Sequence, residues 1–353
     1  MSHEPPLNLA DYEALAPARM HPAVWDYISA GADDGVTMAW NRRAFERIAL
    51  RPRVLADVSR IDPRATLLGA AVSSPIMIAP TGPQAALCPE GEVATVQAAG
   101  KAGLCMIASS GSNQTIEEIA AAATGPIWLQ LYLFPERERT LALVRRAEAA
   151  GCGALVLTAD SPRFGRKEQS LRTEDDFDWP EAGNLKGLPP ATMRPVRGAP
   201  ATWDDLAWLR DVSSLPLVLK GVLTAEDAAL AVERGVEGIV VSNHGGRQLD
   251  GAIAGIDALP EVVAEVGGRA EIYLDSGIRR GTDVLKALAL GARAVMIGRP
   301  VLWGLAVAGA AGALDVLEML KRELELAMAL AGRPTLADID GSLVRTDPAR
   351  TWG

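Results

Sequence analysis

The chain is poor in cysteine, histidine and aromatic residues, and each shortage narrows the class of protein. Its 353 residues include three cysteines, Cys88, Cys105 and Cys152, which lie far apart and form no CxxC motif. We therefore expect reduced core thiols, a cytoplasmic location and no metal site. There are also only three histidines. His3 and His21 lie in the N-terminal region, so His244 is the one imidazole in the body of the chain.

Positive charge and long hydrophobic runs are scarce as well. The formal net charge of −9 argues against nucleic acid or an anionic membrane as the main partner. Residues 1–6 lack the basic and apolar parts of a signal peptide. The longest uncharged apolar stretch, residues 300–314, is shorter than the roughly 20 residues of a membrane span. We expect a buried helix there.

Eight short apolar runs alternate with stretches of helical period. Continuous apolar runs are typical of strands buried on both faces, and strand–helix alternation favours parallel pairing. Eight such units predict a single-domain α/β protein, a (β/α)8 TIM barrel over residues 71–331. The runs are residues 75–80, 103–110, 126–133, 153–160, 216–221, 238–243, 271–277 and 294–298.

Two regions depart from this repeat. Residues 1–70 are predicted to form a helical extension, and residues 165–202, rich in proline, a mobile flap after the fourth strand. Between strands, Thr224 is expected to begin a helix that ends near Gly235, and residues 281–291 form another. Gly100, Gly103 and Gly151 are expected at helix C-termini.

The most informative strand end is Ser-Asn-His-Gly-Gly-Arg-Gln-Leu-Asp at residues 242–250. Active sites of such barrels lie at the C-terminal ends of the strands. A base, His244, and a fixed cation, Arg247, stand three residues apart, with glycines that let a ligand approach the backbone. A lone histidine is more often a hydrogen-bonded core residue; the glycines and Arg247 favour a functional site.

Other strand ends carry polar residues too. Asp160 either caps a helix or orients the imidazole of His244. Lys220 is either a snorkelling lysine or a buried functional one. Arg279 and Arg299 follow the last two strands beside glycines, where such barrels bind phosphate, although each alone is equally well a surface arginine.

These motifs resemble the FMN-dependent α-hydroxy acid oxidases and dehydrogenases, a family that includes glycolate oxidase, lactate oxidase and mandelate dehydrogenase. The similarity runs from about residue 9 to 331, and the sequence at 242–250 matches the family's active-site signature. Further segments that fit are Arg51-Pro52-Arg53, Ile78-Ala79-Pro80-Thr81, Pro89-Glu90-Gly91-Glu92 and Ile297-Gly298-Arg299-Pro300.

The resemblance implies FMN as cofactor and a role for each matching residue. His244 would be the catalytic base, paired with Asp160. Tyr27 and Arg247 would bind the substrate carboxylate, and Tyr132 the substrate hydroxyl. Lys220 would sit by N1 and O2 of the flavin. The remaining cofactor contacts would be Pro80, Thr81, Gly82, Ser109, Gln130, Thr158, Ser242, Asp275, Ser276, Gly277, Ile278, Arg279, Gly298 and Arg299.

The implied reaction is FMN-dependent oxidation of a small-molecule L-2-hydroxy acid to the 2-oxo acid, with oxygen or another compound accepting the electrons. A base near neutral pKa and a bidentate arginine suit this chemistry. Relatives are commonly tetramers, so a homo-oligomer is expected. The alternatives are an FMN barrel acting on a related non-standard substrate, an isomerase, or a non-catalytic flavin- or phosphate-binding protein. A carboxylate clamp beside a base argues against an isomerase, and an intact base with Asp160 and Tyr132 argues against a non-catalytic protein.

Three features depart from the family pattern. Lys167 stands where members usually place a second carboxylate-binding arginine; the adjacent Arg166 should point elsewhere. Gly111 stands where glycolate oxidases carry tryptophan, which either reflects loop drift or makes room for a substrate larger than glycolate, aromatic or long-chain. The flap is shorter than in glycolate oxidase and lacks an apolar membrane anchor, so a soluble enzyme is predicted.

Overall fold

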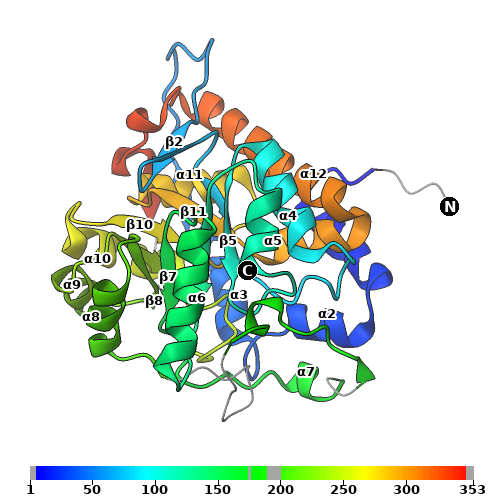
Figure 1. The fold of residues 1–353 in the computed structure, drawn as a ribbon. Coiled ribbons are helices and arrows are strands. Elements are labelled where there is room, and N and C mark those ends of the chain that lie inside the picture. Colours follow the sequence, from blue (N-terminus) through cyan, green and yellow to red (C-terminus); the bar gives the residue numbers. More distant parts are fainter. Residues whose placement is uncertain (1–4, 174–175, 189–199, 347–353) are drawn as a thin grey trace.

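The computed structural model describes residues 5–173, 176–188 and 200–346 and confirms the predicted barrel (Figure 1). Eight parallel strands close on one another in a single sheet. Each lies within, or overlaps closely with, one of the eight apolar runs. They are β4 (Ile76–Ile78), β5 (Cys105–Ser109), β6 (Ile127–Leu131), β7 (Leu155–Thr158), β8 (Leu217–Val222), β9 (Gly238–Val241), β10 (Glu271–Leu274) and β11 (Ala294–Ile297).

The strands are mostly apolar because they are covered on both faces, and polar exceptions such as Gln130, Thr158 and Lys220 lie near their C-terminal ends. All residues of β4, β5, β6, β7, β9 and β11 are buried. One apolar cluster fills the barrel interior, where the Trp128 and Tyr273 rings meet edge to face at 5.6 Å. The outer cover consists of α4 (Gly91–Ala102), α5 (Ile116–Ala122), α6 (Arg137–Ala149), α8 (Trp203–Val212), α9 (Ala225–Glu233), α10 (Gly255–Val266), α11 (Gly281–Ala289) and α12 (Arg299–Ala331).

Most predicted helix ends agree with the structure. The Thr224 hydroxyl accepts a hydrogen bond from the backbone N–H of Asp227 and begins α9. Gly103 ends α4 in the left-handed conformation, and Gly151 and Gly235 have positive φ just past their helices. Gly100 was predicted wrongly, because it lies inside α4. A Cβ there would overlap the Thr124 side chain, so this glycine serves close packing.

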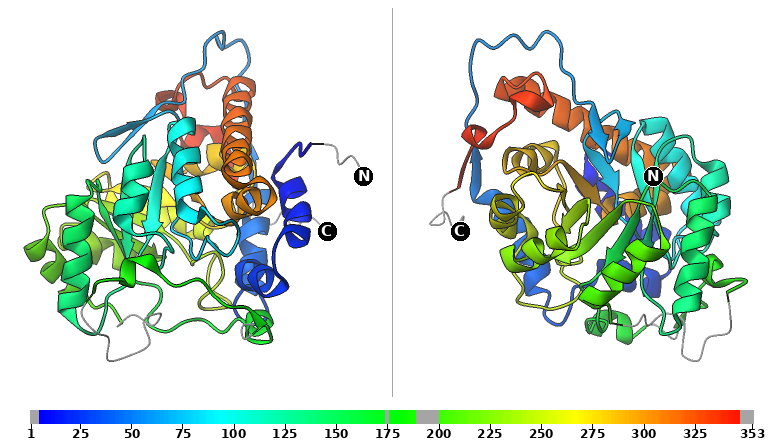
Figure 2. Two further views of the ribbon diagram at one scale, coloured as in Figure 1. Left: turned by 45° about the vertical axis from the view of Figure 1, so that its right-hand side comes forward. Right: turned by 60° about the vertical axis from the view of Figure 1, so that its left-hand side comes forward.

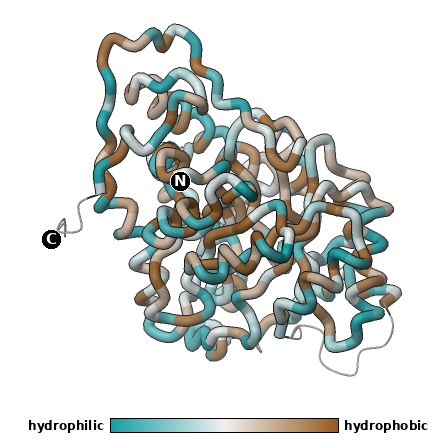
Figure 3. Tube along the Cα trace, turned by 90° about the vertical axis from the view of Figure 1, so that its left-hand side faces the viewer, coloured by the Kyte–Doolittle hydropathy of each residue, from teal (hydrophilic) through white to brown (hydrophobic). Residues whose placement is uncertain are grey.

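The helical extension ends at residue 46, earlier than predicted. It comprises α1 (Leu9–Leu15), a short 3-10 turn, α2 (Pro22–Ser29) and α3 (Val36–Glu46). The chain then forms β1 (Ile48–Leu50), which pairs antiparallel with β12 (Val344–Thr346) near the other end of the sequence. Residues 51–64 arch away from the body and carry a mixture of hydrophobic and hydrophilic residues (Figures 2 and 3). Prolines at 52 and 63 disfavour a helix in this loop.

A hairpin of β2 (Ala65–Leu67) and β3 (Ala70–Val72) closes the N-terminal end of the barrel. Leu67 and Val72 are buried in the same cluster as the interior side chains of the strands. The hairpin immediately precedes β4, which places it at the start of the strands. The opposite, C-terminal end is therefore where polar groups can gather.

The predicted buried helix at 300–314 is interrupted. Within α12 the backbone leaves the helical region at Ala308 and Gly309, where φ of the glycine is +57°. Among the described residues α12 alone is long and apolar enough to cross a membrane by length and composition, and 56% of its apolar window is buried. It packs against α4 and α11, as a core helix does.

The predicted flap is partly described. It contains α7 (Glu168–Leu171), which lies beside α2 (Figure 1). Asp26 of α2 accepts hydrogen bonds from Gln169 at 2.5 Å and from Thr173 at 2.9 Å. A further short 3-10 turn covers Gly183–Leu185. Residues 174–175 and 189–199, with most of the flap's prolines, lie outside the described residues, and the predicted mobility stays a prediction.

Candidate active site

The signature at 242–250 forms a tight turn at the C-terminal end of β9. Three successive residues, His244, Gly245 and Gly246, have φ of +59°, +68° and +73°. The Ser242 hydroxyl accepts a hydrogen bond from the His244 backbone N–H at 3.0 Å. A Cβ on Gly246 would lie 2.6 Å from the Met38 backbone. A histidine in this left-handed conformation is uncommon and typical of functional sites.

The structure brings His244 and Asp160 together, as predicted. Nδ1 of the imidazole lies 2.8 Å from Oδ1 of the carboxylate, although the two residues are 84 positions apart. Burial alone would raise the pKa of Asp160, but the positive charges of His244 and Lys220 and hydrogen bonds from His244 and Ser161 lower it to about 2. The aspartate is therefore ionised and orients the imidazole.

Lys220 is a buried ion-pair partner and not a snorkelling surface lysine. Its side chain is 4% exposed, and Nζ lies 3.0 Å from Asp275 Oδ2 and 4.0 Å from Asp160 Oδ2. Nζ also donates to the Ser242 hydroxyl at 2.7 Å. Burial would lower the pKa of Lys220, but the two carboxylates raise it. The barrel mouth thus holds a permanent positive charge.

Three adjacent strands contribute a buried hydrogen-bond chain. Ser109 donates to Gln130 Oε1 at 3.1 Å, and Gln130 Nε2 donates to Thr158 at 3.0 Å. Asn184 of the flap donates to the Ser109 carbonyl at 3.1 Å. Asn184 could not be predicted from the sequence, because its position depends on how the flap folds back.

A second network fixes the loop after β4. Glu92, fully buried, accepts backbone hydrogen bonds from Gln84 and Asn113, each at 3.1 Å. Burial raises the pKa of Glu92. Gln84 in turn donates to the Thr81 hydroxyl and carbonyl, each at 3.1 Å. Glu92 lay within a segment that resembles the family, but its buried role was not predicted.

Arg279 and Arg299 are partly buried cations without an ion pair among the described residues. Arg299 donates to the carbonyls of Ile28, Ala30 and Gly245 at 2.8 to 3.1 Å. Arg279 donates to its neighbour's carbonyl, and its guanidinium lies 4.8 Å from the centre of the Trp303 ring.

Burial lowers the pKa of Arg279 to about 10 and that of Arg299 to about 9. Buried charges are stabilised by a counterion, and guanidinium groups match phosphate geometry. A phosphate group would supply such a counterion, and the phosphate-binding role of the two arginines stays a prediction.

The loop after β10 joins the turn after β9. Ser276, with φ of +77°, accepts a hydrogen bond from the Gly245 N–H at 2.9 Å and donates to Asp275 at 2.7 Å. Gly277 has φ of +90° and lies against the Asn41 carbonyl, where a Cβ would overlap. Asn41 and Asn243 exchange two side-chain hydrogen bonds at 2.9 and 2.7 Å. This pair was not predicted.

The remaining predicted cofactor residues line the same mouth. A Cβ on Gly82, which follows Pro80 and Thr81, would lie 2.9 Å from the Gly111 carbonyl. A Cβ on Gly298 would lie 3.3 Å from the Thr81 methyl group. The loops after β4, β5 and β11 are thus in close contact. Ile278 is buried beside them.

Arg247 and Tyr27 lie against each other. The guanidinium carbon is 5.0 Å from the centre of the Tyr27 ring, and Nη1 donates to the carbonyls of Tyr27 and Ala30 at 2.7 and 2.9 Å. Tyr132 stands on the other side of the mouth, with its ring 6.2 Å from that of Phe164. Burial raises the pKa of Tyr132 to about 12, so its hydroxyl stays protonated.

Lys167 is close enough to Arg247 to be affected by its charge. Burial and Arg247 together lower the pKa of Lys167 to about 8, and Nζ donates to the Gly165 carbonyl at 3.0 Å. Arg166 is exposed and pairs with Glu168 at 3.4 Å, so it points elsewhere, as predicted. Around Gly111, the nearest atom to a built Cβ would be the Ser109 hydroxyl at 3.6 Å, an ordinary van der Waals contact, so a side chain is not sterically excluded there.

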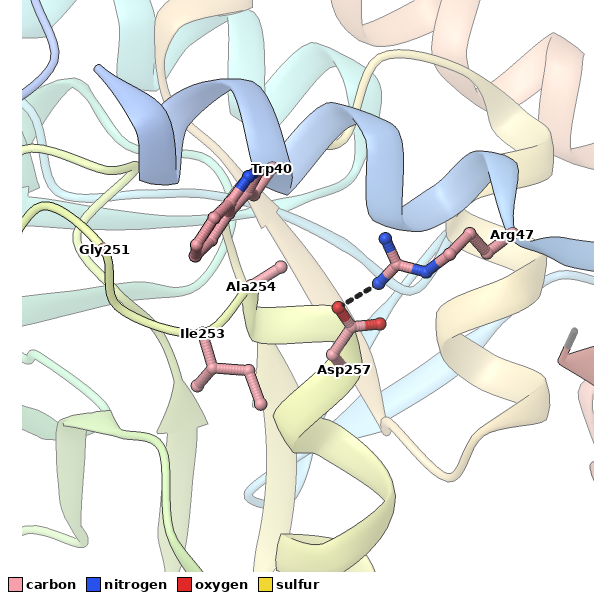
Figure 4. A pocket seen from close by; sticks show the side chains of 6 residues that line it. All are labelled: Trp40, Arg47, Gly251, Ile253, Ala254 and Asp257. Atoms are coloured by element: carbon pink, nitrogen blue, oxygen red, sulfur yellow. Dashed lines mark hydrogen bonds and ion pairs between the residues drawn. The ribbon is translucent and has the colours of Figure 1, made fainter. Parts of the chain in front are cut away.

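A surface cavity of about 340 Å³ lies away from this cluster, between α3 and α10 (Figure 4). Its lining includes none of the predicted site residues, and the ion pair of Arg47 with Asp257 closes one side. The residues that line it are Trp40, Arg47, Gly251, Ile253, Ala254 and Asp257.

A (β/α)8 barrel with a phosphate-type arginine pair, a buried lysine and a histidine–aspartate pair at its mouth defines a flavin-binding oxidoreductase barrel. Residues 16–346 match the model of the FMN-dependent dehydrogenase family. The chain belongs to this family, and FMN is its cofactor.

Individual relatives cover nearly the whole chain. An L-lactate oxidase of Nostoc sp. is 49% identical over 96% of this chain and 98% of its own length. A peroxisomal (S)-2-hydroxyacid oxidase of Arabidopsis thaliana is 46% identical over 98% of both chains. A solved structure of mandelate oxidase with (S)-4-hydroxymandelic acid has a TM-score of 0.90 and 41% identity, covering 97% of this chain and 99% of that one.

Proposed function

We propose that this protein oxidises an (S)-2-hydroxy acid to the 2-oxo acid, with His244 as base and Arg247 as the main carboxylate clamp. The similar lactate, glycolate-type and mandelate oxidases support the substrate class. The single observation that carries the assignment of the base is the 2.8 Å contact between His244 Nδ1 and an ionised Asp160 at the barrel mouth.

The oxidation removes two electrons and two protons from R–CH(OH)–COO⁻. Asp160 holds the proton of His244 on Nδ1, which leaves the Nε2 lone pair to accept a proton from the substrate. The imidazolium that forms is stabilised by the adjacent carboxylate. FMN, when bound, supplies the two-electron acceptor.

Lys220 would lie beside the flavin ring and offset negative charge there, and Ser242 would be held in place by the Lys220 ammonium. Arg279 and Arg299, with the backbone of residues 275–278 and 298, would hold the phosphate and the ribityl end. Pro80, Thr81, Gly82, Ser109, Gln130 and Thr158 would line the ring and the ribityl chain.

Arg247 is placed to bind the substrate carboxylate. Among the described residues only its Nη1 has hydrogen-bond partners, so the rest of the guanidinium fork is available to an anion. The Tyr27 ring centre lies 5.0 Å from its guanidinium carbon, Lys167 adds a second charge, and Tyr132 would bind the substrate hydroxyl.

The lack of a side chain at Gly111 favours a substrate larger than glycolate, with an aromatic or long side chain. The aromatic rings of Phe164 and Trp179 at the flap, the latter 5.2 Å from Tyr27, offer an apolar surface for it. We also propose a cytoplasmic homotetramer that uses oxygen or another electron acceptor, on the family resemblance and the composition of the chain.

The test is anaerobic bleaching of the bound flavin by a panel of (S)- and (R)-2-hydroxy acids from glycolate to mandelate and long-chain acids. We expect reduction by (S)-acids, fastest for the larger ones. Reduction by none of the panel would contradict the proposal and favour the isomerase alternative.

A further inference from the structure

Two residues outside the predicted site, Ser161 and Gln248, are joined to the histidine–aspartate pair. Ser161 donates to Asp160 Oδ1 at 3.0 Å, the same oxygen that contacts His244 Nδ1 at 2.8 Å. Oδ2 of this carboxylate has no hydrogen-bond partner among the described residues. Ser161 therefore shares the oxygen that orients the base.

Gln248 uses both ends of its amide. Its Nε2 donates to the Ser161 hydroxyl in a short hydrogen bond, and its Oε1 accepts the Gly165 N–H at 2.8 Å. Gly165 opens the flap, and its backbone lies directly on the carbonyls of Arg247 and Gln248, where a Cβ would overlap both. The start of the flap and the catalytic turn are thus joined through one side chain.

Ser161 also affects Tyr132. Burial is the main cause of the raised pKa of Tyr132, and a side-chain hydrogen bond with Ser161 acts against it. The Ser161 hydroxyl therefore acts on Asp160, the partner of the proposed base, and also on Tyr132.

We propose that Ser161 and Gln248 form a positioning relay, which runs from the flap at Gly165 to Asp160 and sets the orientation and basicity of His244. The proposal rests on the proposed function, because it takes His244 as the base. Neither residue touches the reacting atoms; both act through Asp160. Docking of the flap start on the turn then places the base in its working position.

The direction of the effect on His244 follows from the charges around it. A donor to Asp160 stabilises the carboxylate and weakens its hold on the imidazolium proton. Removing that donor should raise the imidazolium pKa. The other charged or titratable groups of the mouth are Lys220 from β8, Asp275 after β10, Arg247 and Arg299, Tyr132 after β6, Tyr27 from α2 and Lys167 of the flap.

Ser161→Val and Ser161→Thr are the matched variants, because the two new side chains have the same shape and only threonine keeps the hydroxyl. For the FMN-loaded enzyme, we expect anaerobic flavin reduction to be about tenfold to a hundredfold slower in S161V, the loss that one hydrogen bond to a charged group represents. The acid limb of kcat/KM should move to higher pH. S161T should restore both the rate and the pH profile.

Gln248→Met breaks the relay one step earlier. Its effect and that of S161V should be less than additive in the double variant, because both act through one contact. Full additivity would overturn the relay. Wild-type rates and pH profile in S161V, or equal impairment of S161T and S161V, would do the same.

A readout independent of turnover comes from NMR titration of the imidazoles. With three histidines in the chain, His244 can be assigned by comparison with the His244→Gln variant. Its pKa should rise in S161V and return in S161T. If this shift occurs in a protein that reduces with no hydroxy acid, the relay stands and the proposed function falls. If the enzyme is active and His244 titrates identically in all three proteins, the relay is wrong.

Discussion

The two ends of the barrel are built from the same eight strands but differ in composition and backbone conformation. At the N-terminal end, Trp128 and Tyr273 pack under the β2–β3 hairpin in an apolar cluster with almost no exposure. At the C-terminal end the strands lead to Lys220, Asp160 and a histidine with positive φ. In Figure 1, β2 and α7 lie at opposite ends of the molecule.

This difference separates stability from chemistry. Apolar burial stabilises a fold in proportion to the buried area. Buried charges, and non-glycine residues with a left-handed backbone conformation, cost free energy. The closed end therefore stabilises the fold, whereas the buried charges and unusual backbone conformations of the open end destabilise it. Substitutions at the closed end should therefore change mainly the free energy of unfolding, and substitutions at the open end mainly the rate of flavin reduction.

The largest effect on stability is expected at the closed end. Trp128→Ala should lower the free energy of unfolding by about 3–5 kcal/mol, because it empties a fully buried indole site. Chemical denaturation measures this. Trp40→Ala is the matched control, since Trp40 is 42% exposed, and should cost under about 1 kcal/mol. Equal losses from both would break the comparison.

At the open end, Asp160→Asn should change activity far more than stability. The amide keeps the shape but not the charge, and we expect flavin reduction to be about 100-fold to 10,000-fold slower. The melting temperature should change little, because Lys220 keeps Asp275 as its partner. A stable variant with wild-type reduction rates would contradict the role of Asp160.

Lys167 should make substrate binding depend on pH. With a pKa of about 8, it is charged below that pH and neutral above it, so attraction to the substrate carboxylate weakens as pH rises through 8. We expect KM to rise about tenfold across this range, the size of a lost charge-assisted contact. Lys167→Arg should keep KM low to higher pH; an alkaline rise unchanged in K167R would rule Lys167 out.

The smallest effect is expected from Gly111→Trp. The indole would occupy space beside the Ser109 hydroxyl, which should raise KM for mandelate several-fold and leave KM for lactate almost unaffected. Steady-state kinetics with the two acids measures the ratio. An unchanged ratio would show that Gly111 does not set substrate size, and Gly111→Ala serves as the mild control.

The difference between the two ends also explains which elements could be predicted from the sequence. All eight strands were predictable because both faces of each are covered, so local hydrophobicity alone marks them. The structure of residues 47–70 was not predictable, because β1 depends on pairing with β12 almost 300 positions away. The kink at Ala308–Gly309 was missed because apolar composition does not report backbone angles.

In the candidate site, residues at strand ends were predictable and loop-to-loop contacts were not. His244, Asp160 and Lys220 follow apolar runs, and barrel geometry brings such ends together. Ser161 and Gln248, 87 positions apart, meet only through contact between the loops that follow β7 and β9. Asn184 of the flap and the Asn41–Asn243 pair between α3 and the turn after β9 also depend on contacts between distant segments.

The most direct test of the account is anaerobic flavin reduction in His244→Ala beside the wild type, with (S)-mandelate as reductant. The account predicts that H244A binds FMN, melts near the wild-type temperature and is reduced about 100-fold to 10,000-fold more slowly, the contribution of a positioned base. An FMN-loaded H244A that is reduced at the wild-type rate would contradict it.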